Sequence, residues 1–95
     1  MRNYELMLII RPTDEEEAFK ASLDKISGWV VSGQGEVVKT DLWGRRRMAY
    51  TISGIRDGLY AVLTFKMDPA GLPPLEHSLK LAEDVVRYLI LCLED

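Results

Sequence analysis

Few side chains in this sequence have the chemistry for catalysis. His77 is the only histidine, so no second histidine can complete a metal-binding pair. The one cysteine, Cys92, would need a neighbouring base and an electropositive setting to act as a nucleophile. Strand alternation instead places Cys92 with Tyr88 and Ile90, facing the predicted helices. We therefore expect a surface histidine, a core cysteine and no metal site.

The carboxylates and glycines form no catalytic pattern either. Carboxylates are numerous, but they lie at predicted helix starts and turns, and none forms an obvious pair at the end of a core strand. Gly33-Gln34-Gly35 lacks the third glycine of a nucleotide-binding loop and follows a predicted helix rather than a strand. The sequence therefore predicts no enzyme, no cofactor and no small-molecule substrate.

Three consecutive arginines, Arg45, Arg46 and Arg47, stand out in a chain whose formal net charge is −3. On a strand their side chains alternate, with Arg45 and Arg47 on one side and Arg46 on the other. Guanidinium groups keep their charge and bind phosphate through paired hydrogen bonds. The alternative is a charged edge strand that prevents sheet-to-sheet aggregation, a role that lysine would serve as well. We favour binding to a nucleic-acid backbone.

The apolar pattern predicts the elements that hold these arginines. Residues Asn3 to Arg11 alternate as a strand, which Pro12 ends. A helix follows, with Thr13 as N-cap and Glu16 completing a capping box. The apolar stripe of this helix comprises Phe19, Leu23, Ile26 and Val30. At its end, Gly33 is predicted to be the C′ residue.

The segment from Gly35 to Ile52 is predicted to form one long strand that carries the arginines. Gly44 interrupts this strand and indicates a bulge or a bend. Beyond it, three residues alternate into the core: Met48, Tyr50 and Ile52. By the same alternation Arg46 would face the core, so either the strand has left the core there or a bulge turns Arg46 outward. A turn is predicted over Ser53–Gly58, with Asp57-Gly58 as its hairpin signal.

The rest of the chain predicts a strand, a short helix and a last strand. Leu59 to Met67 alternates, Pro73 and Pro74 permit a helix to begin there, and Val85 to Leu93 is again extended. The order βαββαβ is the split-βαβ, ferredoxin-like pattern of α+β proteins. We expect a single domain over residues 1–95, with a four-stranded antiparallel sheet and both helices on one face.

The sheet face opposite the helices has nothing left in the chain to cover it. By alternation this face carries a mixed but largely apolar set of side chains. Its candidates for a protein-partner surface are Met7, Ile9, Tyr60, Val62, Leu89 and Leu91. A contiguous apolar patch on a sheet more often marks a partner site than a solvated surface. We therefore expect a protein partner on this face.

Composition favours a soluble cytoplasmic protein. A single cysteine excludes an internal disulfide and fits a reducing compartment. The apolar run Leu6–Ile10 is too short for a signal peptide, and no stretch approaches the roughly 18 apolar residues of a membrane helix.

Four segments together carry a family signature. Residues Gly44 to Ile52 are Gly-Arg-Arg-Arg-Met-Ala-Tyr-Thr-Ile, and the chain opens with Met1-Arg2-Asn3-Tyr4-Glu5. Pro12 closes the first strand, and Asp84-Val85 followed by Arg87 leads into the last. In these segments the sequence resembles the bacterial small-subunit ribosomal protein six family, and the resemblance covers essentially the whole chain.

This resemblance implies a ferredoxin-like protein of the small-subunit platform, cytoplasmic and without enzymatic activity. It implies pairing with small-subunit ribosomal protein eighteen, and binding of the pair to the central domain of small-subunit rRNA. It also implies that Arg45, Arg46 and Arg47 contact rRNA phosphates, with Arg2 and Arg87 as weaker candidates. The partner is typically basic, which suits the acidic balance of this chain, and would use the apolar sheet face or its edges.

Three other functions share the predicted topology. A single-strand RNA-binding domain stacks bases on sheet aromatics, but this face offers chiefly Tyr60, and Gly58–Val62 is out of register with the consensus. A small enzyme such as an acylphosphatase needs a phosphate-cradling loop after the first strand, where Arg11-Pro12-Thr13 supplies a lone arginine. A protein-binding adaptor outside the ribosome would explain the open face and leave the arginines unexplained.

Overall fold

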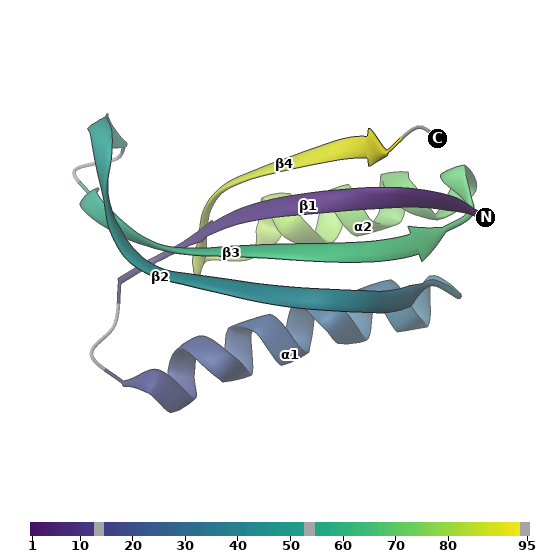
Figure 1. Ribbon diagram of the computed structural model, residues 1–95, viewed down its shortest axis with the longest axis horizontal. Helices are drawn as coiled ribbons and strands as arrows, with labels where there is room; N and C mark the ends of the chain where they lie inside the picture. Colours follow the sequence, from purple (N-terminus) through teal and green to yellow (C-terminus); the bar gives the residue numbers. More distant parts are fainter. Residues whose placement is uncertain (13–14, 53–54, 94–95) are drawn as a thin grey trace.

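The computed structural model describes residues 1–12, 15–52 and 55–93, with the backbone alone at 16, 48–52, 55 and 56 (Figure 1). Within these residues the elements follow the predicted order βαββαβ. They are β1 (Arg2–Ile10), α1 (Glu16–Ser32), β2 (Glu36–Ile52), β3 (Ile55–Met67), α2 (Leu72–Leu81) and β4 (Val85–Leu93). A short 3₁₀ turn, η1 (Pro69–Gly71), leads into α2.

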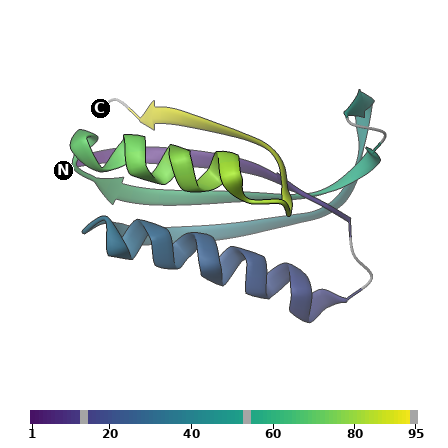
Figure 2. The same ribbon diagram turned by 180° about the vertical axis from the view of Figure 1, so that it is seen from behind.

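The strands form an antiparallel sheet in the order β2-β3-β1-β4. β1 is central: it pairs with β3 from Arg2 opposite Met67 to Ile10 opposite Leu59, and with β4 on its other side. Both helices lie across the same face of this sheet (Figure 2). The predicted ferredoxin-like α+β fold, with two helices on one face of a four-stranded sheet, is confirmed.

The core lies between the sheet and the helices and follows the predicted alternation. The predicted stripe of α1 is buried throughout, at Phe19, Leu23, Ile26 and Val30. It packs with strand residues that include Leu6, Leu63 and Phe65, each with no exposed surface. The Tyr4 and Phe65 rings stack with their centroids 5.5 Å apart. Each such burial contributes about 1.5–3 kcal/mol, so packing of the stripe outweighs a cap worth about 1 kcal/mol.

The N-terminal end of α1 differs from the prediction. Glu15 is the N-cap, and its side chain accepts no capping hydrogen bond. Its backbone carbonyl accepts hydrogen bonds from the amides of Ala18 and Phe19, which places the first helical residue at Glu16. The predicted capping box, which needed Glu16 three residues after the cap, is therefore wrong; Thr13 lies outside the described residues.

The C-terminal end of α1 is displaced by one residue from the prediction. The amides of Gln34 and Gly35 donate to the carbonyls of Val31 and Val30, at 2.9 and 2.8 Å. This is a Schellman arrangement, and its left-handed C′ residue is Gln34, with φ 65°. Gly33 is the C-cap itself, at φ −84°.

The connection between β2 and β3 is shorter than the predicted turn over Ser53–Gly58. β3 already begins at Ile55, and Asp57-Gly58 lies inside it, opposite Arg47 and Arg46. The hairpin signal at Asp57-Gly58 is therefore wrong, because both residues belong to β3. Residues 53–54 lie outside the described part of the chain.

Gly58 is needed for close packing rather than for a turn. A Cβ at this position would overlap the Cγ2 methyl of Ile9 on the neighbouring strand. We expect Gly58→Ala to destabilise the fold by about 1–3 kcal/mol, the usual cost of overpacking. The measurement is the free energy of unfolding in urea. Gly28→Ala in α1 is the matched control, because a Cβ there meets nothing within 4 Å, and it should stabilise the helix by about 0.5–1 kcal/mol. Equal stability of the Gly58 variant and the wild type would contradict the packing argument.

An ionic contact ties α1 to the entry of β4. Lys25 Nζ lies 3.2 Å from the Asp84 carboxylate, and the Arg11 amide donates to the Asp84 carbonyl at 2.8 Å. Burial alone raises the pKa of Asp84, but hydrogen bonds from Ser22 and Lys25 lower it more, so the net pKa lies below its ordinary value. The ionised carboxylate therefore stabilises the fold above pH about 3.8, and this contribution is lost as the pH falls through the lower pKa of the folded state.

Candidate nucleic-acid and protein interfaces

The ends of β2 and β3 form an arm that reaches past the rest of the sheet. In the described residues, β1 pairs with β3 only as far as Leu59. Arg45 lies opposite Leu59, and beyond this pair β2 and β3 pair with each other alone. We call this two-stranded extension the arm; it turns out of the line of the sheet at the left of Figure 1. Arg45 stands at the root of the arm, and Arg46 and Arg47 lie within it.

The bulge predicted at Gly44 is confirmed, and it settles where Arg46 points. The β2–β3 register shifts between Leu42 and Gly44, and Gly44 has φ +83°, a conformation that favours glycine. After the shift, Arg46 lies opposite Gly58, two residues from Tyr60 along β3. Arg46 therefore shares the face of Tyr60, away from the helices, and the bulge has turned it outward.

The side chains predicted to alternate into the core beyond the arginines, Met48, Tyr50 and Ile52, lie outside the described residues. Their backbone is part of β2.

The guanidinium groups of the arm are exposed and only lightly engaged. Arg46 Nε donates to the Trp43 carbonyl at 3.4 Å, which braces the side chain against the bulge. Arg47 Nε lies 4.0 Å from the Asp57 carboxylate, and the Arg47 side chain is 84% exposed. An ion pair this long and this exposed contributes little, so a phosphate can replace it at small cost.

The other two predicted RNA-binding residues lie at opposite ends of the sheet. Arg87 is exposed on β4 opposite Ile9, at the end of β1 nearest the arm. It belongs to the same face as Arg46. Arg2 is exposed at the first residue of β1, opposite Met67, at the end farthest from the arm. The structure thus brings Arg87 toward the arm and leaves Arg2 apart from it.

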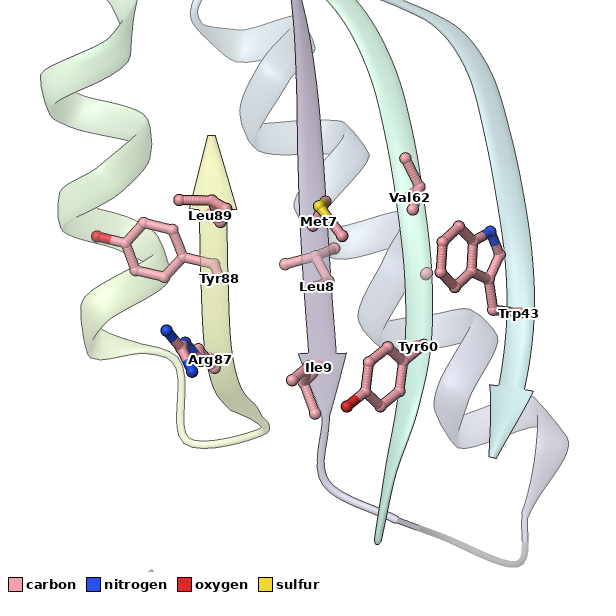
Figure 3. Close-up of a pocket in the computed structure, with 10 residues that line it drawn as sticks. Met7, Leu8, Ile9, Trp43, Tyr60, Val62, Arg87, Tyr88 and Leu89 are labelled. Carbon is pink, nitrogen blue, oxygen red and sulfur yellow. The ribbon is translucent and has the colours of Figure 1, made fainter. Parts of the chain in front are cut away.

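The face opposite the helices, called here the open face, is apolar and slightly hollow. The hollow measures about 180 Å³, and Figure 3 shows its lining. Five of the six predicted partner residues line it: Met7, Ile9, Tyr60, Val62 and Leu89. Leu89 is 51% exposed, and Leu91 farther along β4 is 41% exposed. Val62 is only 7% exposed, because its own neighbours already cover it, and so it offers little surface to a partner.

Trp43 is the residue of this face that the sequence did not reveal. It lies at the β2 bulge and is 49% exposed. Its indole lies beside Val62 in Figure 3 and forms one wall of the hollow. The available signal was a large aromatic directly before Gly44, where a bulge shifts the alternation of the strand.

His77 lies on α2, and Cys92 lies on β4. His77 is exposed on α2, as predicted. Cys92 is exposed, so the predicted core cysteine is wrong. The predicted side of the strand was right, because Tyr88 and Ile90, which share that side with Cys92, pack against the core. β4 is an edge strand, however, and Cys92 lies near its end, with Tyr4 of β1 beside it on one side.

No three His, Cys, Asp or Glu side chains of the described residues lie close enough to hold a metal ion. Within the same residues, no helix is both long and apolar enough to cross a membrane.

Fold and surface together define a class: a ferredoxin-like α+β protein with a basic hairpin arm beside an apolar open face. The family model described as ribosomal protein S6 matches residues 3–91. The chain therefore belongs to the ribosomal protein S6 family, as its signature segments predicted.

Individual relatives match nearly the whole of this chain. The chain is 43% identical over 95 residues to small ribosomal subunit protein bS6 of Moorella thermoacetica, covering 100% of this chain and 97% of the relative. It is 43% identical over 91 residues to bS6 of Desulforamulus reducens, covering 96% of each chain. The crystal structure of 30S ribosomal protein S6 from Thermotoga maritima superposes with a TM-score of 0.91 at 27% identity, covering 97% of this chain and 87% of that one.

Proposed function

We propose that this protein is a structural constituent of the small ribosomal subunit in the bacterial cytoplasm, and not an enzyme. It binds the central domain of small-subunit rRNA together with small-subunit ribosomal protein eighteen. Family membership supports the place in the subunit. The observation that carries the binding mechanism is the Gly44 bulge, which is followed by three exposed arginines, one at the root of the arm and two within it.

The RNA-binding half of the proposal rests on local charge rather than on net charge. The segment from Lys39 to Arg56 holds five basic residues against one acid, Asp41, although the whole chain carries −3. A polyanion responds to this local field, and the arginines are exposed to it on both sides of the ribbon. Arg46 and Arg87 would contact phosphates on the open-face side, and Arg45 and Arg47 on the other. Arg2 would serve a separate phosphate at the far end of β1.

The protein-binding half rests on the open face. Leu89, Leu91 and Trp43 each leave 41% or more of their surface exposed around the hollow. An exposed apolar area with a polar rim is the usual anatomy of a protein interface. A partner with basic character would complement the acidic balance of this chain. Its position beside the arm would place the RNA contacts of both proteins on one continuous surface.

A ferredoxin-like RNA-binding or protein-binding adaptor outside the ribosome would use the same two surfaces. Cosedimentation with small ribosomal subunits separates the two functions, because an adaptor has no reason to remain with the subunit.

A further inference from the structure

The aromatic ring of Tyr60 lies next to the root of the arm, with a glycine on each of two sides. Gly44 is opposite Tyr60 on β2, and a Cβ on Gly44 would meet nothing within 4 Å. Gly58 lies two residues earlier on β3, and a Cβ there would come within 3.6 Å of Tyr60 Cε1, so the ring reaches back over Gly58. In Figure 3 the ring extends from β3 toward Ile9. Because neither glycine has a side chain to cover it, Tyr60 stays partly exposed on the open face.

Arginines stand on both sides of this ring, on the same face of the sheet. Ile9 of β1 pairs with Tyr60 of β3 on one side and with Arg87 of β4 on the other. Arg46 of β2 lies opposite Gly58, beneath the reach of the Tyr60 ring. Since β4 and β2 are the outer strands, the backbones at Arg87 and Arg46 are separated by about 14 Å across the sheet. A few unstacked nucleotides can bridge such a span.

The positive charge at this end of the sheet includes one more arginine, Arg11, directly after β1. Its Nε donates to the Glu83 carbonyl at 2.9 Å, a neutral acceptor that leaves the charge of the guanidinium in place. Glu83 and Asp84 border a depression between α1 and α2, on the helix side, where the Asp84 carboxylate contacts Lys25. A basic protein partner would therefore be repelled at this end of the open face, whereas a polyanion would be attracted.

An open aromatic ring flanked by guanidinium groups is the arrangement on which proteins stack unpaired bases of RNA. The guanidinium groups bind the phosphates of the strand, and the ring takes the flat face of a base. The bases of an uninterrupted duplex are stacked on one another, so a duplex alone cannot use the ring. The chemistry of this end of the open face thus fits a nucleotide that has left its stack.

We propose that Tyr60 stacks against an unpaired base of rRNA, while Arg46 and Arg87 bind the phosphates on either side of that nucleotide. The inference rests on the proposed function and adds to it the kind of RNA element, one with an unpaired nucleotide in place of uninterrupted duplex. It also divides the open face: Tyr60 belongs to the RNA contact, and Leu89 and Leu91 belong to the protein contact.

Two substitutions of Tyr60 test the stacking in the complex of the full chain with its partner protein. Tyr60→Leu keeps an apolar side chain without the ring, and central-domain rRNA should bind about 5- to 100-fold more weakly. The slope of log affinity against log salt should stay unchanged, because stacking releases no counterion, whereas Arg46→Gln should reduce it by about 0.7–0.9. Tyr60→Phe keeps the ring and should bind rRNA as the wild type does. Titration calorimetry should show unchanged pairing of both Tyr60 variants with the partner protein.

An RNA hairpin with a single unpaired 2-aminopurine in its stem reports the contact directly. The wild-type chain and the Tyr60→Phe variant should quench the fluorescence of this base, and the Tyr60→Leu variant should not. The same hairpin without the unpaired nucleotide should bind the wild-type chain about fivefold or more weakly.

Full rRNA affinity of the Tyr60→Leu complex would overturn the proposal. So would the absence of quenching by the wild-type chain, or equal binding of the two hairpins. Weaker pairing of Tyr60→Leu with the partner protein would assign the ring to the protein interface and would equally overturn it. A failure of the proposed function is distinguishable from these results, because the wild-type complex would then not bind central-domain rRNA at all.

Discussion

Replacing Arg45, Arg46 and Arg47 together with glutamine should weaken the binding of the protein pair to rRNA and flatten its salt dependence. Each phosphate contact releases bound counterions, so its loss reduces the slope of log affinity against log salt by about 0.7–0.9. Loss of all three contacts should change the slope by about two to three units. The measurement is a titration of central-domain rRNA with the complex of this chain and its partner, repeated between about 50 and 200 mM salt.

Two further variants separate charge from geometry and from general effects of charge. Replacing the same three arginines with lysine keeps the charge, so the slope should persist while affinity falls with the loss of paired hydrogen bonds. Lys80→Gln removes a charge from the last turn of α2, on the helix side of the sheet, and should leave the slope unchanged. An unchanged slope in the triple glutamine variant would show that the arm does not contact phosphate.

Leu89→Asp and Met7→Asp should each abolish tight pairing with the partner protein while the chain stays folded. Both residues line the hollow of the open face, and the Leu89 side chain is already 51% exposed. A carboxylate buried by the partner without a counter-charge removes the apolar contact and adds a desolvation cost. A central interface residue of this kind contributes about 2 kcal/mol or more, roughly thirtyfold in affinity. Titration calorimetry measures the affinity, and circular dichroism reports the fold.

The chain offers controls for both outcomes of this second experiment. Leu81→Asp changes a leucine that is 69% exposed on α2, and should leave pairing intact. Val62→Asp changes a side chain that is only 7% exposed, and should unfold the domain by itself. If the Leu89→Asp variant bound the partner protein with wild-type affinity, the partner would not bind at this face. Unfolding of Met7→Asp would mean that this position belongs to the core.

Alternation and helical periodicity predicted the elements because both report burial directly. The stripe of α1 and the inward residues of β1 are buried as expected. The errors fall where local signals compete with tertiary contacts. Asp57-Gly58 has the composition of a turn, but Gly58 is small because Ile9 of a neighbouring strand approaches it. Cys92 has the alternation of a core residue, but an edge strand leaves its end uncovered.

The candidate surfaces were also predicted only in part, because local sequence patterns do not fix the register between strands. The arginines and most of the apolar residues of the open face follow from residue type and alternation. Which way Arg46 points, and the presence of Trp43 on the open face, depend on the exact register shift between Leu42 and Gly44. A glycine in a strand indicates that a bulge exists. Whether the alternation of side chains changes before or after that glycine is decided by the strand pairing, which the sequence pattern does not give.

The most direct measurement of the central claim is cosedimentation of the tagged chain with small ribosomal subunits from a bacterial lysate, quantified across a sucrose gradient. We expect the chain to migrate with the small subunit at about equal stoichiometry, and we expect both the triple-glutamine variant and Leu89→Asp to be depleted from that fraction, as two cooperating contact surfaces require. A folded wild-type chain that remains at the top of the gradient, away from the subunit, would contradict the account.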